Sequence, residues 1–274
     1  MIVPGYTKYC PYAEGELGLP LILLTNDDGI FAPGINAIRA EMEKLAGVEV
    51  WAVAPDRERS ASGHAITMYR PLFPLKADIP GATAPCYSVT GTPADAAKLA
   101  IDELLPRRPD LVISGINRGP NLGTDLFYSG TVAAAREGPI LGIPAIAASL
   151  DSWTSLDYGV AARFTAQLAL KVLKEGIPAG TMLNVNVPGL PDAEIQGVRI
   201  TTMGRRLYRD QWDKRQDPRG RTYYWLAGEL MELDNDPDSD VSAVEAGYIS
   251  VTPVQLDLTR KDQLERLDGW NLKL

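Results

Sequence analysis

Strand-like and helix-like segments alternate along residues 21–200, and this alternation limits the fold more than any other feature of the sequence. Apolar runs that suit buried strands, such as residues 21–25 and 110–116, are separated by amphipathic segments such as residues 158–175. A strand–helix–strand order predicts βαβ units with right-handed crossovers. Parallel strands that are buried on both faces are continuously apolar, as these runs are. We therefore expect an α/β fold with a mostly parallel sheet.

Helix-end signals place further elements in this region. Pro33 suits the first turn of a helix, and Gly47 suits its end. Thr92 and Asp95 form a capping box with a proline between them, which predicts a helix that runs to about residue 105. The same patterns predict strands at residues 48–54, 143–149 and 182–187 and a helix at residues 129–141.

The pattern changes after about residue 200, where charged and aromatic residues become dense. Strands are predicted at residues 222–231 and 248–254, and a short helix at residues 261–267. A two-stranded arm is weak alone, so we expect it to pack against another subunit. We divide the chain into an N-terminal extension (residues 1–20), an α/β core (residues 21–200) and a C-terminal arm with a closing segment (residues 201–274).

Composition excludes several classes of protein. The chain carries a net charge of −8, which is unlike that of a protein that binds duplex nucleic acid. It has one histidine in 274 residues, so two-histidine zinc motifs cannot be built. We expect no membrane span, because no run of about 18 apolar residues occurs. The first twenty residues lack a signal-peptide pattern, and Cys10 and Cys86 are far apart, so we expect a cytoplasmic protein.

Two adjacent carboxylates, Asp27 and Asp28, follow the first predicted strand. Gly29 permits a sharp turn beyond the strand, so both carboxylates can face one point. Carboxylates that lie this close repel each other unless they share a proton or a cation, and a hard divalent ion such as Mg²⁺ or Mn²⁺ suits oxygen ligands. The alternative is a turn in which both acids are solvated.

Three more candidate loops follow predicted strands or begin a helix. Residues 54–64 contain small and hydroxyl side chains and His64, which suits a general acid/base but is more often structural. Residues 114–125 offer glycines and asparagines without the spacing of a dinucleotide-binding or P-loop motif. Ser129 opens a helix, where backbone N–H groups can bind an anion, although Ser129 can equally act as a cap alone.

An acidic stretch at residues 234–245 partly matches the spacing of a calcium-binding EF-hand loop. Ser239 stands where that loop requires glycine, and Pro237 interrupts it. We therefore interpret residues 234–240 as a solvated turn.

Six segments together resemble the SurE family of metal-dependent nucleoside-monophosphate phosphatases (5′/3′-nucleotidases). The resemblance covers about residues 21–259 and is carried by the segments LLTNDDGIFAPGI, VAPDRERSASGHAIT, GTPADA, VISGINRGPNLGTDLFYSGTVAAAREG, LNVNVP and AGYISVTPVQLDLT. It implies a Rossmann-like, three-layer αβα core and a C-terminal β-hairpin arm that joins subunits into a homodimer or homotetramer.

The resemblance also assigns roles to individual residues. It implies one divalent metal ion per subunit, held by Asp27, Asp28, Ser60 and Asn117, with Asp27 and Asp28 as the catalytic residues. It implies that the phosphate is held by Asn121, Ser129, Gly130 and Thr131, and that Thr92 and Asp95 lie near the substrate.

The resulting hypothesis is hydrolysis of nucleoside 5′- and 3′-monophosphates by a water that the cation activates. Attack by one of the two aspartates remains open beside direct attack by water. The alternative function is a non-catalytic nucleotide-binding or assembly module in which the acids hold a structural cation. A Rossmann-type redox protein is disfavoured, because no G-x-G-x-x-G motif is present.

Overall fold

The computed structural model describes residues 18–231 and 236–273, so most of the predicted extension (residues 1–17) lies outside the described residues. The strands of the main sheet are β1 (Leu21–Thr25), β2 (Glu49–Pro55), β3 (Pro74–Lys76), β4 (Cys86–Val89), β5 (Leu111–Arg118), β6 (Ala145–Asp151), β7 (Thr181–Pro188), β8 (Gly197–Ile200) and β11 (Tyr248–Gln255). Within the described residues, these nine strands lie in the order β3-β4-β2-β1-β5-β6-β7-β11-β8.

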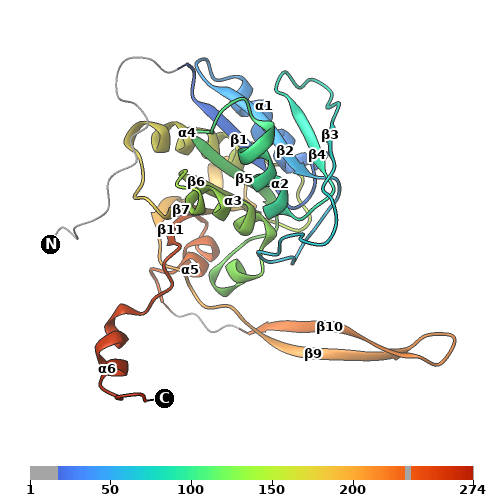
Figure 1. Cartoon of the computed structure of the whole chain (residues 1–274), viewed down its shortest axis with the longest axis vertical. Helices are drawn as coiled ribbons and strands as arrows, with labels where there is room; N and C mark the ends of the chain where they lie inside the picture. Colours follow the sequence, from blue (N-terminus) through green and yellow to red (C-terminus); the bar gives the residue numbers. More distant parts are fainter. Residues whose placement is uncertain (1–17, 232–235, 274) are drawn as a thin grey trace.

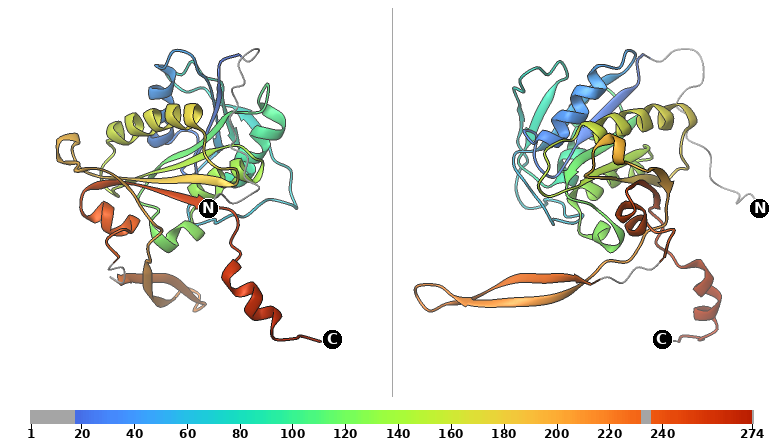
Figure 2. Two further views of the ribbon diagram at one scale, coloured as in Figure 1. Left: turned by 90° about the vertical axis from the view of Figure 1, so that its left-hand side faces the viewer. Right: turned by 180° about the vertical axis from the view of Figure 1, so that it is seen from behind.

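Helices cover both faces of this sheet, which confirms the three-layer αβα arrangement (Figure 1). They are α1 (Pro33–Glu43), α2 (Pro93–Leu99), α3 (Gly130–Ile140), α4 (Gly159–Glu175) and α5 (Asp240–Glu245), whereas α6 (Leu264–Asp268) lies away from the sheet (Figures 1 and 2). Helix α1 packs against α4, and α2 packs against α3. The predicted helix that starts at Pro93 continues as a π-helical turn, Ala100–Leu104, and ends where expected.

Alternation along β1 explains how the layers are held together. Ile22 and Leu24 point into the core that includes α1 and α4, whereas Leu23 points into the core that includes α2 and α3. All three side chains are fully buried. Burial of such a side chain stabilises the fold by about 1.5–3 kcal/mol, so the central strand anchors both helical layers.

The C-terminal quarter of the chain contributes to this sheet as well as to the arm. β11 lies between β7 and β8, antiparallel to β7 and parallel to β8. Helix α5 packs against β7 and β11. Residues 201–274 are therefore not all outside the core. The short strands β3, β4 and β8 were not predicted, because three or four residues carry no clear periodicity.

The arm is a long antiparallel hairpin of β9 (Leu207–Gln216) and β10 (Thr222–Met231). It projects away from the sheet and its helices (Figures 1 and 2). Large aromatic side chains on it are exposed, among them Trp212, Tyr224 and Trp225. Its use in oligomerisation stays a prediction.

The expectation of a solvated turn at residues 234–240 is wrong at its C-terminal end, and Asp234 lies outside the described residues. Ser239 caps α5 by accepting a hydrogen bond from Ser242 N, and Asp240 is fully buried. The Asp240 carboxylate accepts the N–H groups of Gly123 at 3.0 Å and Gly204 at 2.8 Å. These buried N–H groups need an acceptor, so Asp240 joins two distant loops and is neither solvated nor an EF-hand ligand.

No helix within the described residues is long and apolar enough to cross a membrane. The cytoplasmic location stays a prediction from the sequence. Cys86 is buried and free, and Cys10 lies outside the described residues.

Candidate active site

The order in which strands are added to the sheet reverses between β1 and β5. From β1 the chain builds β2 and β4 on one side and then crosses to β5 on the other side. In open α/β sheets, ligands bind outside the carboxyl ends of the strands at such a point. Asp27 and Asp28 follow β1, and Asn117 lies near the end of β5, so the fold brings these predicted ligands to the two strands that flank the crossover.

The turn after β1 is held by its own side chains and by the loop after β2. Asn26 accepts a hydrogen bond from Gly29 N at 3.1 Å and donates one to Gly29 O at 3.0 Å. Arg59 N donates to Asp27 O at 2.7 Å, which brings the loop that contains Ser60 against this turn. Gly29 has φ = +100°, and a Cβ there would lie 3.1 Å from the Arg57 backbone, so the turn requires glycine.

The two aspartates lie in different surroundings. Asp27 is buried and accepts a hydrogen bond from the Thr131 hydroxyl. Burial raises the pKa of Asp27 from 3.8 to about 6, with a smaller contribution from Asp28, while the bond from Thr131 opposes the rise. Asp28 is partly exposed and accepts Arg118 N at 3.3 Å. Burial also raises the pKa of Asp28, opposed by the Arg118 N–H and reinforced by Glu58.

The N-terminus of α3 lies against Asp27. Ser129 caps this helix by accepting Val132 N at 3.0 Å, which confirms the capping role. A Cβ on Gly130 would lie 2.8 Å from both Cβ and Oδ2 of Asp27, so only glycine permits this approach. The predicted phosphate-binding residues at the start of α3 therefore lie beside Asp27.

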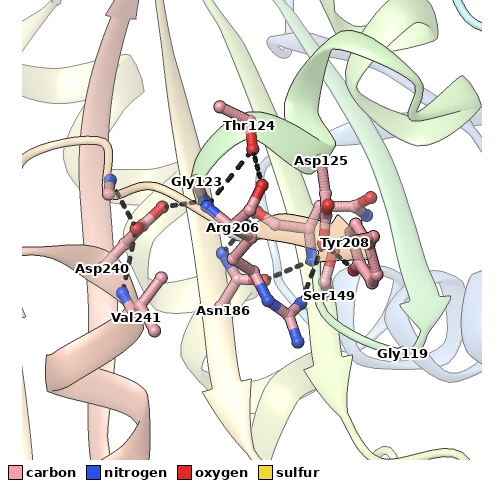
Figure 3. Close-up of polar contacts among 12 residues, drawn as sticks. Gly119, Gly123, Thr124, Asp125, Ser149, Asn186, Arg206, Tyr208, Asp240 and Val241 are labelled. Atoms are coloured by element: carbon pink, nitrogen blue, oxygen red, sulfur yellow. Dashed lines mark hydrogen bonds and ion pairs between the residues drawn. The ribbon is translucent and has the colours of Figure 1, made fainter. Parts of the chain in front are cut away.

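Asn186 and Ser149, which are labelled in Figure 3, hold Asn121 in a buried polar cluster. Its N–H donates to Asn186 Oδ1 and its side-chain amide donates to Ser149 Oγ, both at 2.8 Å. Its carbonyl accepts from the side chains of Asn184 and Asn186 at 2.9 and 3.1 Å. These two asparagines were not predicted as site residues, although polar residues at alternate positions of the apolar strand β7 were the signal.

Within the described residues, no hydrogen bond joins the side chains of Ser60 and Asn117 to those of the two aspartates. Ser60 is exposed, and its hydroxyl donates to Glu58 Oε1 at 2.8 Å. The Asn117 amide donates to Gly119 O at 2.9 Å, which orients the side chain and leaves its oxygen as an acceptor. Their role as metal ligands stays a prediction.

Thr92 and Asp95 hold the loop after β2 as well as capping α2. The capping box is present in both directions, as predicted. Asp95 also accepts from the backbone N–H and hydroxyl of Thr67 at 2.9 and 2.5 Å, and the Thr92 hydroxyl donates to Ala65 O at 2.7 Å. In this structure, these two residues support the neighbouring loop.

His64 pairs with a buried carboxylate that the sequence analysis did not connect to it. Its Nε2 lies 2.5 Å from Oε1 of Glu137 on α3. The pair joins the loop that contains Ser60 to the helix that begins at Ser129. The two residues are 73 positions apart, so local sequence gave no signal for the contact.

A family model described as "Survival protein SurE" matches residues 22–210. The chain belongs to the SurE family. A "5′-nucleotidase SurE" from Symbiobacterium thermophilum is 76% identical over 254 residues, which cover 93% of this chain and 99% of that protein. The "5′-nucleotidase SurE" of Heliobacterium modesticaldum is 51% identical over 249 residues, 91% of each chain.

The fold agrees with that of a solved SurE protein. The crystal structure of the SurE protein from Aquifex aeolicus matches with a TM-score of 0.80 and 44% identity. The match covers 92% of this chain and 100% of that one. The likeness to SurE proteins thus extends well beyond the six segments that suggested it.

Proposed function

We propose that the chain is a metal-dependent 5′-nucleotidase that hydrolyses nucleoside monophosphates to a nucleoside and phosphate. The observation that carries this proposal is the packing of Asp27 against the N-terminus of α3. This packing supports the proposal, because an acid pair that suits a cation and a helix end that suits an anion are the two parts that a phosphate monoester requires. The names of the 76% and 51% identical relatives support the same activity.

The proposed metal site consists of Asp27, Asp28, Ser60 and Asn117. The donor set fits a hard divalent cation, Mg²⁺ or Mn²⁺, because every ligand is an oxygen. No group of three or more His, Cys, Asp or Glu side chains suited to a metal occurs in the described parts of the chain. The proposed site would have two acidic ligands and two neutral ones, which would limit its repulsion of a phosphate dianion. Burial raises the pKa of both acids, which favours a shared proton or cation beside them.

When bound, the cation would act as a Lewis acid toward the phosphate and lower the pKa of an attacking water. Ser129, Gly130 and Thr131 would bind the phosphate oxygens through the end of α3, an eleven-residue helix whose dipole favours negative charge. Asn121 would hold the loop between β5 and α3 in place. Thr131 would fix the orientation of Asp27 through its hydroxyl.

A non-catalytic module that binds nucleotides around a structural cation is the alternative. Both functions use the same acid pair and the same helix end, so turnover separates them. We further propose that the exposed aromatic side chains of the β9–β10 hairpin pack against another copy of the chain in a homodimer or homotetramer.

The experiment is phosphate release from a panel of nucleoside 5′- and 3′-monophosphates, with EDTA-stripped protein and Mg²⁺ or Mn²⁺ added back. We expect release that depends on the metal. Asp28→Asn is expected to reduce kcat by about 10²-fold or more, because it removes a charged ligand. Asp78→Asn, which changes an exposed acid, is the matched control. Absence of turnover with every monophosphate and both metals would favour the non-catalytic module.

A further inference from the structure

A pocket of about 710 Å³ lies between the loop that precedes α3 and the base of the hairpin. Its lining includes Ala61, Phe127, Tyr128, Leu207 and Leu226. Small-molecule sites typically have volumes of about 300–1,000 Å³, so the pocket is large enough for a ligand. The residues that line it are not among the site residues predicted from the sequence.

The pocket adjoins the proposed phosphate site through a single turn. Tyr128 directly precedes Ser129, and the N–H groups of both residues donate to Asp125 O, at 3.0 and 3.1 Å. Gly63 N donates to Tyr128 O at 3.0 Å, which ties the loop after β2 to the same turn. If a phosphate is bound at the start of α3, the group esterified to it therefore lies beside this pocket.

The lining suits a flat apolar group. Tyr128 is 71% exposed and Phe127 is 49% exposed, and Leu207 and Leu226 of the hairpin are also exposed. Large apolar side chains that gather at the surface beside a functional site mark a binding surface. Nucleobases stack on such aromatic side chains, whereas a phosphate group gains nothing from them.

The wall of the pocket formed by the hairpin is held in place by a polar cluster (Figure 3). Asp125 Oδ2 lies 2.9 Å from Arg206 Nη1 and accepts a hydrogen bond from Tyr208 OH, also at 2.9 Å. Arg206 N donates to Thr124 Oγ1 at 3.2 Å. Arg206 and Tyr208 line the pocket themselves, so its shape is set before a ligand enters, which lowers the entropic cost of binding.

We propose that this pocket binds the nucleoside of the substrate, with the base packed on Tyr128 and Phe127. The inference deepens the proposed nucleotidase function and rests on it for the position of the phosphate. It makes the base of the hairpin part of the substrate site. It also assigns the preference for nucleotides over simple phosphate monoesters to this surface.

The test compares Tyr128→Ala with Trp270→Ala, which truncates an exposed aromatic side chain that lies outside the hairpin and does not line the pocket. The measured quantity is kcat/KM for adenosine 5′-monophosphate divided by kcat/KM for ribose 5-phosphate, which lacks a base. We expect Tyr128→Ala to lower this ratio by about 5- to 100-fold, the value of one base–aromatic stack. Trp270→Ala should leave the ratio unchanged.

An equal loss for both substrates would overturn the proposal, since Tyr128 would then only support the loop. An unchanged ratio would overturn it as well. Adenosine binding, measured by calorimetry, tests the pocket without turnover, and Tyr128→Ala should weaken it by a similar factor. Adenosine binding without hydrolysis of any nucleotide would refute the nucleotidase function but keep the pocket. Hydrolysis with no adenosine binding and an unchanged ratio would refute the pocket alone.

Discussion

Removal of the charge on Asp27 is expected to stabilise the metal-free protein. The carboxylate is 4% exposed, and burial, with a smaller contribution from Asp28, raises its pKa from 3.8 to about 6. A raised pKa means that the folded state disfavours the ionised form, so ionisation of Asp27 destabilises the fold. In Asp27→Asn the side-chain oxygen still accepts the Thr131 hydroxyl while the charge is absent.

The size of the effect follows from linkage. A pKa of about 6 in place of 3.8 corresponds to about 3 kcal/mol, at about 1.4 kcal/mol for each pH unit. The penalty is absent below pH 3.8, grows as the pH rises toward 6, and is constant above that. The free energy of unfolding of Asp27→Asn should therefore exceed that of the wild type by up to about 3 kcal/mol at pH 7–8, which corresponds to roughly 6–12 °C in Tm. The two values should be equal near about pH 4.

The assay is urea or thermal unfolding of both proteins in EDTA across pH 4–8. Asp78→Asn, at an exposed position, controls for the change in net charge and should show no such pH dependence. Added Mg²⁺ or Mn²⁺ should raise the stability of the wild type more than that of Asp27→Asn, because binding to the folded state stabilises it. An Asp27→Asn protein that is no more stable than the wild type at pH 7 would refute this reasoning.

Three further outcomes are expected. Gly130→Ala places a Cβ 2.8 Å from Asp27 Oδ2. Titration calorimetry should therefore show weaker Mn²⁺ binding, and kinetic measurements should show at least about a 10²-fold loss of kcat/KM. Normal values would show that the start of α3 shifts to accommodate the Cβ. Arg206→Gln breaks a mostly buried ion pair with Asp125 and should lower the free energy of unfolding in urea by about 1–3 kcal/mol. Arg215→Gln breaks an exposed ion pair and should have a smaller effect, so equal losses would contradict the assignment. Burial raises the pKa of Glu43, but hydrogen bonds from Arg39, Thr83 N and Ala84 N outweigh it and hold the pKa below 4.5. The ionised Glu43 therefore stabilises the fold above pH 4.5, and this stabilisation is lost at lower pH. Glu43→Gln should abolish this loss of stability in an acid-unfolding titration.

Elements that depend on local pattern were predicted well from the sequence. The first strand and β10 begin and end at the predicted residues, and the capping box at Thr92 forms as expected. Each of these rests on burial periodicity or on contacts within three residues. The signals are present in any short window of the chain.

Elements that depend on distant partners were predicted less well. Asp240 lies in a stretch whose composition suggests a solvated turn, yet N–H groups from residues 123 and 204 draw it into the interior. The sequence indicated a strand at β11 but not that it is inserted between β7 and β8. For the candidate site, the family motifs supplied the residue set, whereas the His64–Glu137 pair and the pocket at the hairpin base needed the three-dimensional arrangement.

The insertion of β11 has a consequence for how the protein is made. In the described sheet, β8 pairs only with β11, and β11 follows it by about fifty residues that include the whole hairpin. While the ribosome is still making the hairpin, the acids of the site and α3 already exist, but β8 has no neighbour and Gly123 lacks the carboxylate of Asp240. The nascent chain can therefore assemble its first seven strands early, but the carboxylate of Asp240 binds Gly123 N only after the hairpin has been made.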